Sequence, residues 1–224
     1  MDKIIDIKKA VSMVKDGDRI MFGGFGHVGS PRNLIRALGE TDVKDLHTVS
    51  YDLGITIRGF NQTHSRLVER GTITSSQCCF IGQNPVAGEK YMEGKIDIEF
   101  IPMGTLAERI RAGGSGIGGF YTKTGVGTLV EEGKETKIID GEKYILEKPI
   151  RADVAFIKAY KADKYGNAVF KYTAENFNPI MAMAADLVIL EAEKIVEVGE
   201  IEPDEVKLPG VFVDYVVEAG EVVL

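Results

Sequence analysis

The segment DGDRIMFGGFGHVGSP, residues 16–31, restricts the fold of this chain more than any other. Residues 19–22 are a short, mostly apolar run of the kind that forms a buried strand. Ser30 and Pro31 are a typical N-cap and first-turn pair for a helix over about residues 31–38. The glycines between them reach positive φ at low cost and let a ligand or another backbone approach closely. The segment therefore predicts a strand, a glycine loop and a helix in that order.

The same alternation of strands and helices continues along the chain. Further strands are predicted at 46–50, 73–76, 96–102, 154–160 and 186–193, and helices at 6–16, 57–69, 85–93, 105–113 and 177–184. Asp6 is expected to cap the first helix, and Thr105 with Glu108 to form a capping box. This rhythm is typical of parallel βα units, so we predict an α/β fold with an open, mainly parallel sheet and flanking helices.

The alternation is interrupted between residues 115 and 150, a segment that begins rich in glycine and threonine. Asp140-Gly141 is a hairpin signal between two short strands, which predicts a small β-rich insertion. A polar tail follows from about residue 199. Because no internal repeat or low-complexity linker divides the chain, we expect a single domain over residues 1–224.

Composition and charge exclude several classes of function. The chain has 224 residues, 44% of them hydrophobic, and a net charge of −7 with interspersed signs, which argues against a nucleic-acid surface. No window approaches the roughly 20 apolar residues of a membrane span.

Cys78 and Cys79 are neighbours that point to opposite faces of a strand, so they are poorly placed for a disulfide or a shared metal. A reducing, cytoplasmic setting is therefore expected. The histidines lack metal-ligand spacing, so no metal is predicted, and only His27, inside the loop, is placed to touch a substrate.

The glycine loop by itself leaves alternatives open. Gly24, Gly26 and Gly29 form G-x-G-x-x-G, and Asp52 follows the second strand, where a dinucleotide-binding fold places an acidic residue for a ribose. This match favours a nucleotide-dependent oxidoreductase. A tight turn without a ligand is the other interpretation, since Pro31 removes one donor from the helix start.

Three long segments, taken together, resemble the α subunit of family I CoA-transferases. They are the glycine-loop segment, PMGTLAERIRAGGSGIGGFYTKTGVGT and KAYKADKYGNAVFKYTAENFNPIMAMAA. The similarity spans nearly all of residues 2–217 and is greatest to the acetate, butyrate–acetoacetate and 3-oxoacid enzymes. It implies a CoA-transferase-like fold and transfer of coenzyme A between a short-chain acyl-CoA and a free acid such as acetate, butyrate or acetoacetate.

In that family the covalent nucleophile is a β-subunit glutamate, which becomes an acyl-glutamyl anhydride and then a glutamyl-CoA thioester. The Ser-Glu-Asn-Gly context of that glutamate is missing from this sequence. Glu175-Asn176 lies in an α-type motif where relatives commonly carry arginine, and we expect it to cap the next helix. The resemblance thus implies no catalytic nucleophile in this chain, a β-subunit partner in an α2β2 assembly, and acyl-CoA as a substrate with no permanently bound cofactor.

If the nucleophile belongs to the β subunit, the role left to this chain is to position the substrate and to stabilise the charge that develops on it. Thioester attack places negative charge on a carbonyl oxygen, and fixed backbone N–H donors in a dry cleft stabilise that charge. The predicted wall of this cleft is Gly23, Gly24, Phe25 and Gly26, with Phe25 shielding it from water. Met103 stands where relatives usually have a glutamine donor. Because a thioether cannot donate a hydrogen bond, either the backbone donates, or acyl preference has changed, or Met103 only fills a gap beneath the loop.

Other polar residues have two interpretations each. Asn84 follows a strand, where a parallel sheet opens its cleft, so it either orients substrate or forms an Asn-Pro turn. The segment with Tyr121, Thr122, Thr124, Gly125 and Gly127 contributes to the acyl pocket or makes the turns of the insertion. A non-enzymatic ligand-sensing domain is a third class of function, for which an appended DNA-binding or effector segment is expected and is not seen.

Overall fold

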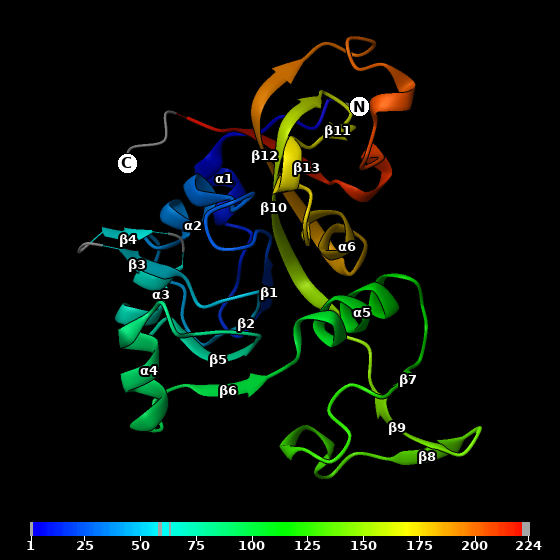
Figure 1. The fold of residues 1–224 in the computed structure, drawn as a ribbon. Helices are drawn as coiled ribbons and strands as arrows, with labels where there is room; N and C mark the ends of the chain where they lie inside the picture. The colour runs from blue at the N-terminus through cyan, green and yellow to red at the C-terminus, as the bar shows by residue number, and fades with distance from the viewer. Residues whose placement is uncertain (1, 58–59, 63, 221–224) are drawn as a thin grey trace.

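The computed structural model describes residues 2–57, 60–62 and 64–220, and an eight-stranded sheet forms its centre (Figure 1). Its strands are β1 (Arg19–Phe22), β2 (Leu46–Val49), β5 (Ile73–Cys78), β6 (Asp97–Phe100), β10 (Ala152–Asp163), β11 (Ala168–Val169), β12 (Ala185–Val196) and β13 (Tyr215–Glu218). The order is β13-β12-β10-β1-β2-β5-β6, with all of these neighbours parallel and β11 antiparallel to β10. The expected open, mainly parallel sheet is confirmed.

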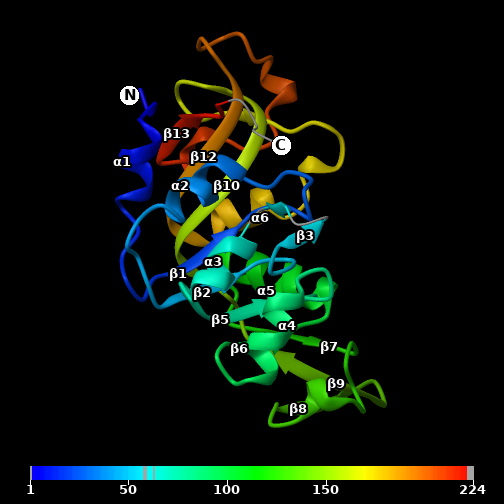
Figure 2. The same ribbon diagram turned by 90° about the vertical axis from the view of Figure 1, so that its left-hand side faces the viewer.

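Helices cover both faces of this sheet (Figures 1 and 2). One face carries α1 (Ile7–Val11), α2 (Arg32–Leu38), α3 (Ser65–Arg70) and α4 (Pro85–Met92), and the other carries α5 (Met103–Gly114) and α6 (Asn178–Met183). Each face has its own hydrophobic core: Ile20 and Phe22 of β1 belong to one, and Met21 between them belongs to the other. This two-residue alternation explains why the strand sequence is apolar without a polar face.

The order of the strands has a reversal next to β1. From β1 the chain proceeds to β2, β5 and β6 on one side, and then returns to build β10, β12 and β13 on the other. In open α/β sheets, ligands bind beyond the carboxyl ends of the strands at such a switch point. The glycine loop follows β1 directly, so the topology places it at the edge where a ligand is expected.

Smaller elements surround the main sheet. Two minor sheets are β3 (Ile55–Ile57) with β4 (Phe60–Gln62), and β7 (Phe120–Thr122), β9 (Glu142–Glu147) and β8 (Thr136–Ile139) in that order. Short 3-10 helices lie at Leu129–Glu131, Tyr172–Ala174, Pro203–Glu205 and Gly210–Phe212. The β7-β9-β8 sheet is the expected β-rich insertion, and Asp140 (φ 51°) with Gly141 (φ 80°) forms its β8–β9 turn as predicted. None of the helices described is long and apolar enough to cross a bilayer.

Several predicted helices differ from the observed ones. Asp6 caps α1 by accepting from Lys8 N–H at 2.8 Å, but α1 ends at Val11 rather than near residue 16. The helix predicted over 57–69 is wrong in its first part, where Ile57 ends β3 and Phe60–Gln62 forms β4. The predicted range includes residues 58–59 and 63, which lie outside the described residues. The polar tail contains β13, which the sequence pattern did not reveal.

Two predicted caps are also wrong. Ser30 makes no side-chain cap on α2, whose N-cap residue is Pro31. The Thr105–Glu108 capping box is not formed, because α5 begins two residues earlier and Glu108 instead pairs with Arg111 at 2.7 Å. Local sequence located both helices, while the groups that satisfy their first N–H donors depend on the tertiary structure.

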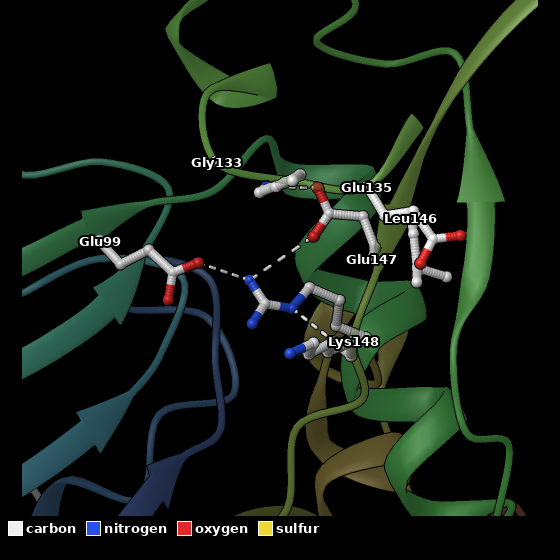
Figure 3. Close-up of a pocket in the computed structure, with 8 residues that line it drawn as sticks. Glu99, Gly133, Glu135, Leu146, Glu147 and Lys148 are labelled. Carbon is white, nitrogen blue, oxygen red and sulfur yellow. Dashed lines mark hydrogen bonds and ion pairs between the residues drawn. The ribbon is translucent and has the colours of Figure 1, made fainter. Parts of the chain in front are cut away.

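A charged cluster joins the β7-β9-β8 sheet to the main body and lines a cavity of about 460 Å³ (Figure 3). Arg109 of α5 donates to the Glu99 carboxylate of β6 at 2.7 Å and to the Lys148 carbonyl at 2.8 Å. Glu147 of β9 is 1% exposed and lies between Lys134, at 2.6 Å, and Arg109, at 3.8 Å. Its buried carboxylate thus depends on two cations.

Removal of Arg109 is expected to destabilise the fold. Arg109→Ala leaves Glu147 with one cation instead of two, so we expect a loss of about 3 kcal/mol in the free energy of unfolding. The matched control is Arg111→Ala on the same helix, whose solvent-exposed pair with Glu108 should contribute much less to stability. Urea unfolding of both variants measures the difference, and equal losses would contradict this role of Arg109.

Candidate functional site

The glycine loop, residues 23–29, is a closed turn between β1 and α2. Phe25 N–H donates to the Val28 carbonyl at 3.0 Å, and Val28 N–H donates back at 3.1 Å. Gly24 has φ 116°, Gly26 φ 59° and Gly29 φ 72°, a region that side chains rarely adopt. The loop conformation therefore depends on its glycines.

Asp52 fixes the loop from the β2 side. Its carboxylate, in a residue that is 5% exposed, accepts from Gly26 N–H at 3.0 Å and from Gly54 N–H at 2.7 Å. The Asp52 carbonyl accepts from the Ser50 hydroxyl at 2.6 Å and from Nε2 of the buried His64. The carboxylate that a dinucleotide fold would offer to a ribose is thus engaged within the protein.

Asn178, the first residue of α6, fixes the loop from the β10 side. Its amide donates to the carbonyls of Gly29 at 3.1 Å and Ala174 at 2.9 Å, and its Oδ1 accepts from Lys158 N–H at 2.9 Å. A Cβ on Gly23 would lie 1.9 Å from this Oδ1, so only glycine fits there. Sequence reasoning missed Asn178, although it lies inside the third resemblance segment.

Asn176 has a role other than the predicted one. It makes no side-chain cap on α6, whose N-cap is Phe177. Instead its amide donates to the Val28 carbonyl at 3.0 Å, so a second asparagine side chain holds the glycine loop.

Among the described residues, one buried residue of the loop has a backbone N–H without a partner. Gly23 N–H donates to the Phe156 carbonyl at 2.9 Å, and the N–H groups of Phe25 and Gly26 donate to Val28 and Asp52. Gly24 N–H has no hydrogen-bond partner among the described residues, and Gly24 is buried. Because buried unpaired N–H groups are rare, this donor marks a place where a ligand oxygen is expected.

An aromatic pair lies beside the loop. Phe25 is 42% exposed and stacks on Tyr51 with ring centroids 3.7 Å apart. Tyr51 contacts Phe177 in turn, at 6.4 Å between centroids. Burial, followed by the nearby Cys79, raises the pKa of Tyr51, which keeps its phenol neutral. This stack is an apolar surface next to the unpaired donor.

Of two other predicted site residues, Met103 is exposed and Asn84 is buried. Met103 is the first residue of α5 and is 51% exposed, so it does not fill a gap beneath the loop. Asn84 is 1% exposed; its Oδ1 accepts from Ala87 N–H at 3.1 Å, and its Nδ2 donates to the Leu53 carbonyl at 2.7 Å. With both amide atoms engaged, Asn84 acts as the N-cap of α4, which favours the turn interpretation.

The threonine-rich segment belongs to the small sheet. Tyr121 and Thr122 lie in β7, and the Tyr121 hydroxyl donates to Glu135 at 2.5 Å. Thr124 and Gly127 lie in the turn that follows, where Gly125 has φ 92° and no room for a Cβ beside Val130. These contacts favour the alternative that the segment makes the turns of the insertion.

The N-terminus of α2 holds a carboxylate of the protein itself. Glu191 of β12, 0% exposed, accepts from the N–H groups of Asn33 and Leu34, both at 2.9 Å. Burial raises the pKa of the Glu191 carboxyl. The two N–H donors and Lys158 favour the carboxylate and limit this rise. A dinucleotide fold directs this helix end at a pyrophosphate. Because Glu191 occupies it and Asp52 is engaged, the geometry argues against the dinucleotide alternative.

The fold is that of a doubly wound α/β protein, and its candidate ligand site lies at the carboxyl ends of β1 and β10. Residues 4–219 match the coenzyme A transferase family model, and the chain belongs to that family. It is 46% identical to one subunit of a probable succinyl-CoA:3-ketoacid coenzyme A transferase of Bacillus subtilis, over 94% of this chain and 87% of that protein. It is 40% identical to the alpha chain of the acetate CoA-transferase of Escherichia coli, over 98% of both.

Solved structures have the same fold. An acyl-CoA transferase from Escherichia coli O157:H7, in a thioester complex with CoA, superposes with a TM-score of 0.87 and 24% identity. That match covers 97% of this chain but 47% of the other, so this chain spans about half of that protein. Glutaconate coenzyme A-transferase from Acidaminococcus fermentans superposes with a TM-score of 0.81. The predicted family and fold class are confirmed.

The buried histidine behind Asp52 is expected to make stability depend on pH. His64 Nδ1 has no partner among the described residues, and burial lowers the pKa of His64 below its usual 6.5. The unfolded chain therefore binds a proton first as pH falls, so stability is lost below about pH 6.5, by at most about 1.4 kcal/mol per pH unit. Melting at pH 7.5 and 5.5 measures this loss.

His64→Gln keeps a donor for the Asp52 carbonyl but does not titrate, so its stability should fall less over the same interval. The control is His47→Gln, because His47 is exposed on β2. The same pH dependence in wild type and His64→Gln would show that His64 is not responsible.

Proposed function

We propose that this chain is the α subunit of a CoA-transferase that moves coenzyme A between a short-chain acyl-CoA and a free acid such as acetate, butyrate or acetoacetate. It acts with a β subunit, in an α2β2 assembly, and CoA is a substrate rather than a bound cofactor. The Bacillus and Escherichia relatives are themselves single subunits by name, and they are matched over 87% and 98% of their length, which supports a whole-subunit equivalence. We further propose one domain over residues 1–224 and a cytoplasmic setting, where the free thiols stay reduced.

The observation that carries this proposal is the Gly24 N–H at the switch point of the sheet, which has no partner in the part of the chain that the structure describes. In the proposed reaction a β-subunit glutamate attacks the thioester carbonyl, whose oxygen becomes negative. Collapse expels the CoA thiolate and leaves an acyl-glutamyl anhydride. The thiolate then attacks the glutamyl carbonyl, releasing the carboxylate and forming the glutamyl-CoA thioester. Gly24 N–H donates to the developing oxyanion, and its fixed position avoids reorganisation during reaction.

The other proposed site residues support this donor. Gly23 and Gly26 hold the loop in place through their bonds to β10 and Asp52. Phe25, stacked on Tyr51, excludes water, which would otherwise hydrolyse the anhydride and the thioester. Met103 offers an apolar thioether to the acyl chain at the start of α5, and Asn84 contributes through the cap that orders α4.

The purified chain alone is expected to show no CoA transfer, because the sequence context of the nucleophilic glutamate is missing from it. Addition of a β subunit should restore transfer, measured as acetyl-CoA formed from acetate and acetoacetyl-CoA. Steady transfer by the isolated chain that disappears in Glu175→Gln would refute the assignment.

The role of the loop donor is tested by two alanine substitutions in the assembled complex. At Gly24 a Cβ would lie 3.0 Å from the Ser30 backbone at φ 116°, which displaces the donor, so Gly24→Ala should lower kcat by about 10²-fold. Gly26→Ala is the matched control, since Gly26 also has positive φ (59°) but its N–H already bonds Asp52.

Both variants should lose stability, by about 1–3 kcal/mol each. Only Gly24→Ala should lose kcat when rates are divided by the amount of folded complex. Equal kcat in the two variants would show that the loop is a structural turn.

A further inference from the structure

A second cavity, of about 220 Å³, lies on the β10 side of the glycine loop. The residues that line it include His27, Gly29, Arg32, Lys158, Lys171 and Glu193. Because β10 and β1 flank the switch point of the sheet, a ligand is expected at this edge. Pockets for complete drug-sized ligands measure roughly 300–1,000 Å³, so this cavity suits a single charged group.

The charge of the cavity is positive, although the chain as a whole carries −7. Three cationic residues, Arg32, Lys158 and Lys171, line the cavity together with one acidic residue, Glu193. A second, buried carboxylate, that of Glu191, lies 3.8 Å from Lys158. Lys158 is 7% exposed and lies 3.3 Å from the Glu193 carboxylate, which fixes its position. An unbalanced positive charge remains at the cavity and attracts an anion.

Lys171 provides that unbalanced charge. Its Nζ lies 4.7 Å from the centre of the Tyr160 ring, and the Nζ of Lys194 lies 5.3 Å from the same ring. Neither lysine forms an ion pair with a carboxylate within the described part of the chain. Contact between an ammonium group and an aromatic ring is weaker than a charge-assisted hydrogen bond to an anion. Both lysines lower the pKa of the Tyr160 phenol, and Lys194 has the larger effect.

The loop also contributes a ring nitrogen whose hydrogen-bonding capacity is unused among the described residues. Nδ1 of His27 is buried and has no partner among the described residues. Burial and Arg32 lower the pKa of His27, so the ring is neutral near pH 7. A neutral imidazole donates from one ring nitrogen, and in the Nδ1–H tautomer it donates to a bound anion.

We propose that this cavity binds one anionic group of the substrates, a phosphate or a carboxylate, and so anchors the substrate beside the glycine loop. The inference rests on the proposed function, whose acyl-CoA substrate carries phosphates. A dicarboxylic acid such as succinate, which extends the proposed range of acids, would carry a carboxylate remote from the reacting one. Lys171, with Lys158 and His27, holds this group. Acetate has no second carboxylate and cannot use the cavity in that way.

The first experiment titrates the full chain with inorganic phosphate and with succinate by calorimetry at low salt. Lys171→Gln should weaken binding of the anion that fits by about fivefold or more, and raised ionic strength should weaken it further. The matched control is Lys137→Gln, because the Nζ of Lys137 lies 5.5 Å from the Tyr121 ring on the small sheet, in a similar contact away from the cavity. Binding that is equal in wild type and Lys171→Gln, or equally weakened by Lys137→Gln, would overturn the proposal.

The second experiment, on the assembled complex, distinguishes the two sources of the anion. If the group is a CoA phosphate, Lys171→Gln raises the KM for acyl-CoA about fivefold whichever acid accepts, with kcat within twofold of wild type. If it is a remote carboxylate, the KM for succinate rises and that for acetate does not. Unchanged KM values for all three substrates would overturn the proposal.

These outcomes are separable from the proposed function. A complex that transfers CoA while its anion binding is independent of Lys171 refutes the cavity and leaves the enzyme assignment intact. A complex that transfers no CoA, although the chain binds phosphate through Lys171, refutes the assignment and leaves the cavity.

Discussion

The buried side chain of Asn178 is the interaction on which the arrangement of the glycine loop depends. It joins three segments distant in sequence: the loop through Gly29, β10 through Lys158 N–H, and the 172–178 segment through Ala174. Both the oxygen and the nitrogen of its side-chain amide form hydrogen bonds, and the residue is 0% exposed. A carboxylate of the same shape would face two carbonyl oxygens, so the site requires an amide. With Asp52 on the opposite side, the loop is held before any ligand arrives.

The carboxylate at α2 has a related consequence. A free helix N-terminus next to a glycine loop would attract phosphate groups. Glu191 satisfies two of those donors from inside the protein, and Lys158 lies 3.8 Å from it. The positive end of the helix is thus used for stability, while Gly24 N–H has no partner among the described residues. The same G-x-G-x-x-G pattern therefore produces different chemistry, because residues outside the pattern decide which donors remain free.

This distinction explains what the sequence could and could not predict. Strand, loop and helix at residues 19–38 follow from glycine, proline and local apolar patterning, and the turn at Asp140-Gly141 follows from its need for positive φ. Family resemblance supplied the class of protein, which is confirmed, and the prediction that the loop is its site. The roles of Asn178 and Glu191 were missed because each acts on a backbone about 150 residues away in sequence, as in the pair Asn178–Gly29, separated by 149. Local patterns carry no information on such partners, and for the same reason Ser30 was predicted as the cap of α2.

The number of unpaired backbone N–H donors in the glycine loop helps to explain why, under the proposed function, this chain needs a partner. Three of the four loop N–H groups from Gly23 to Gly26 are bonded within the protein. One remaining donor contributes about 10² to 10³ in rate, whereas enzymes accelerate reactions by at least about 10⁶. The remainder requires a nucleophile, its positioning and further stabilisation of the oxyanion. Under the proposed function we expect a β subunit to provide the nucleophile, and the loop, held by Asp52 and Asn178, to present a fixed surface to it.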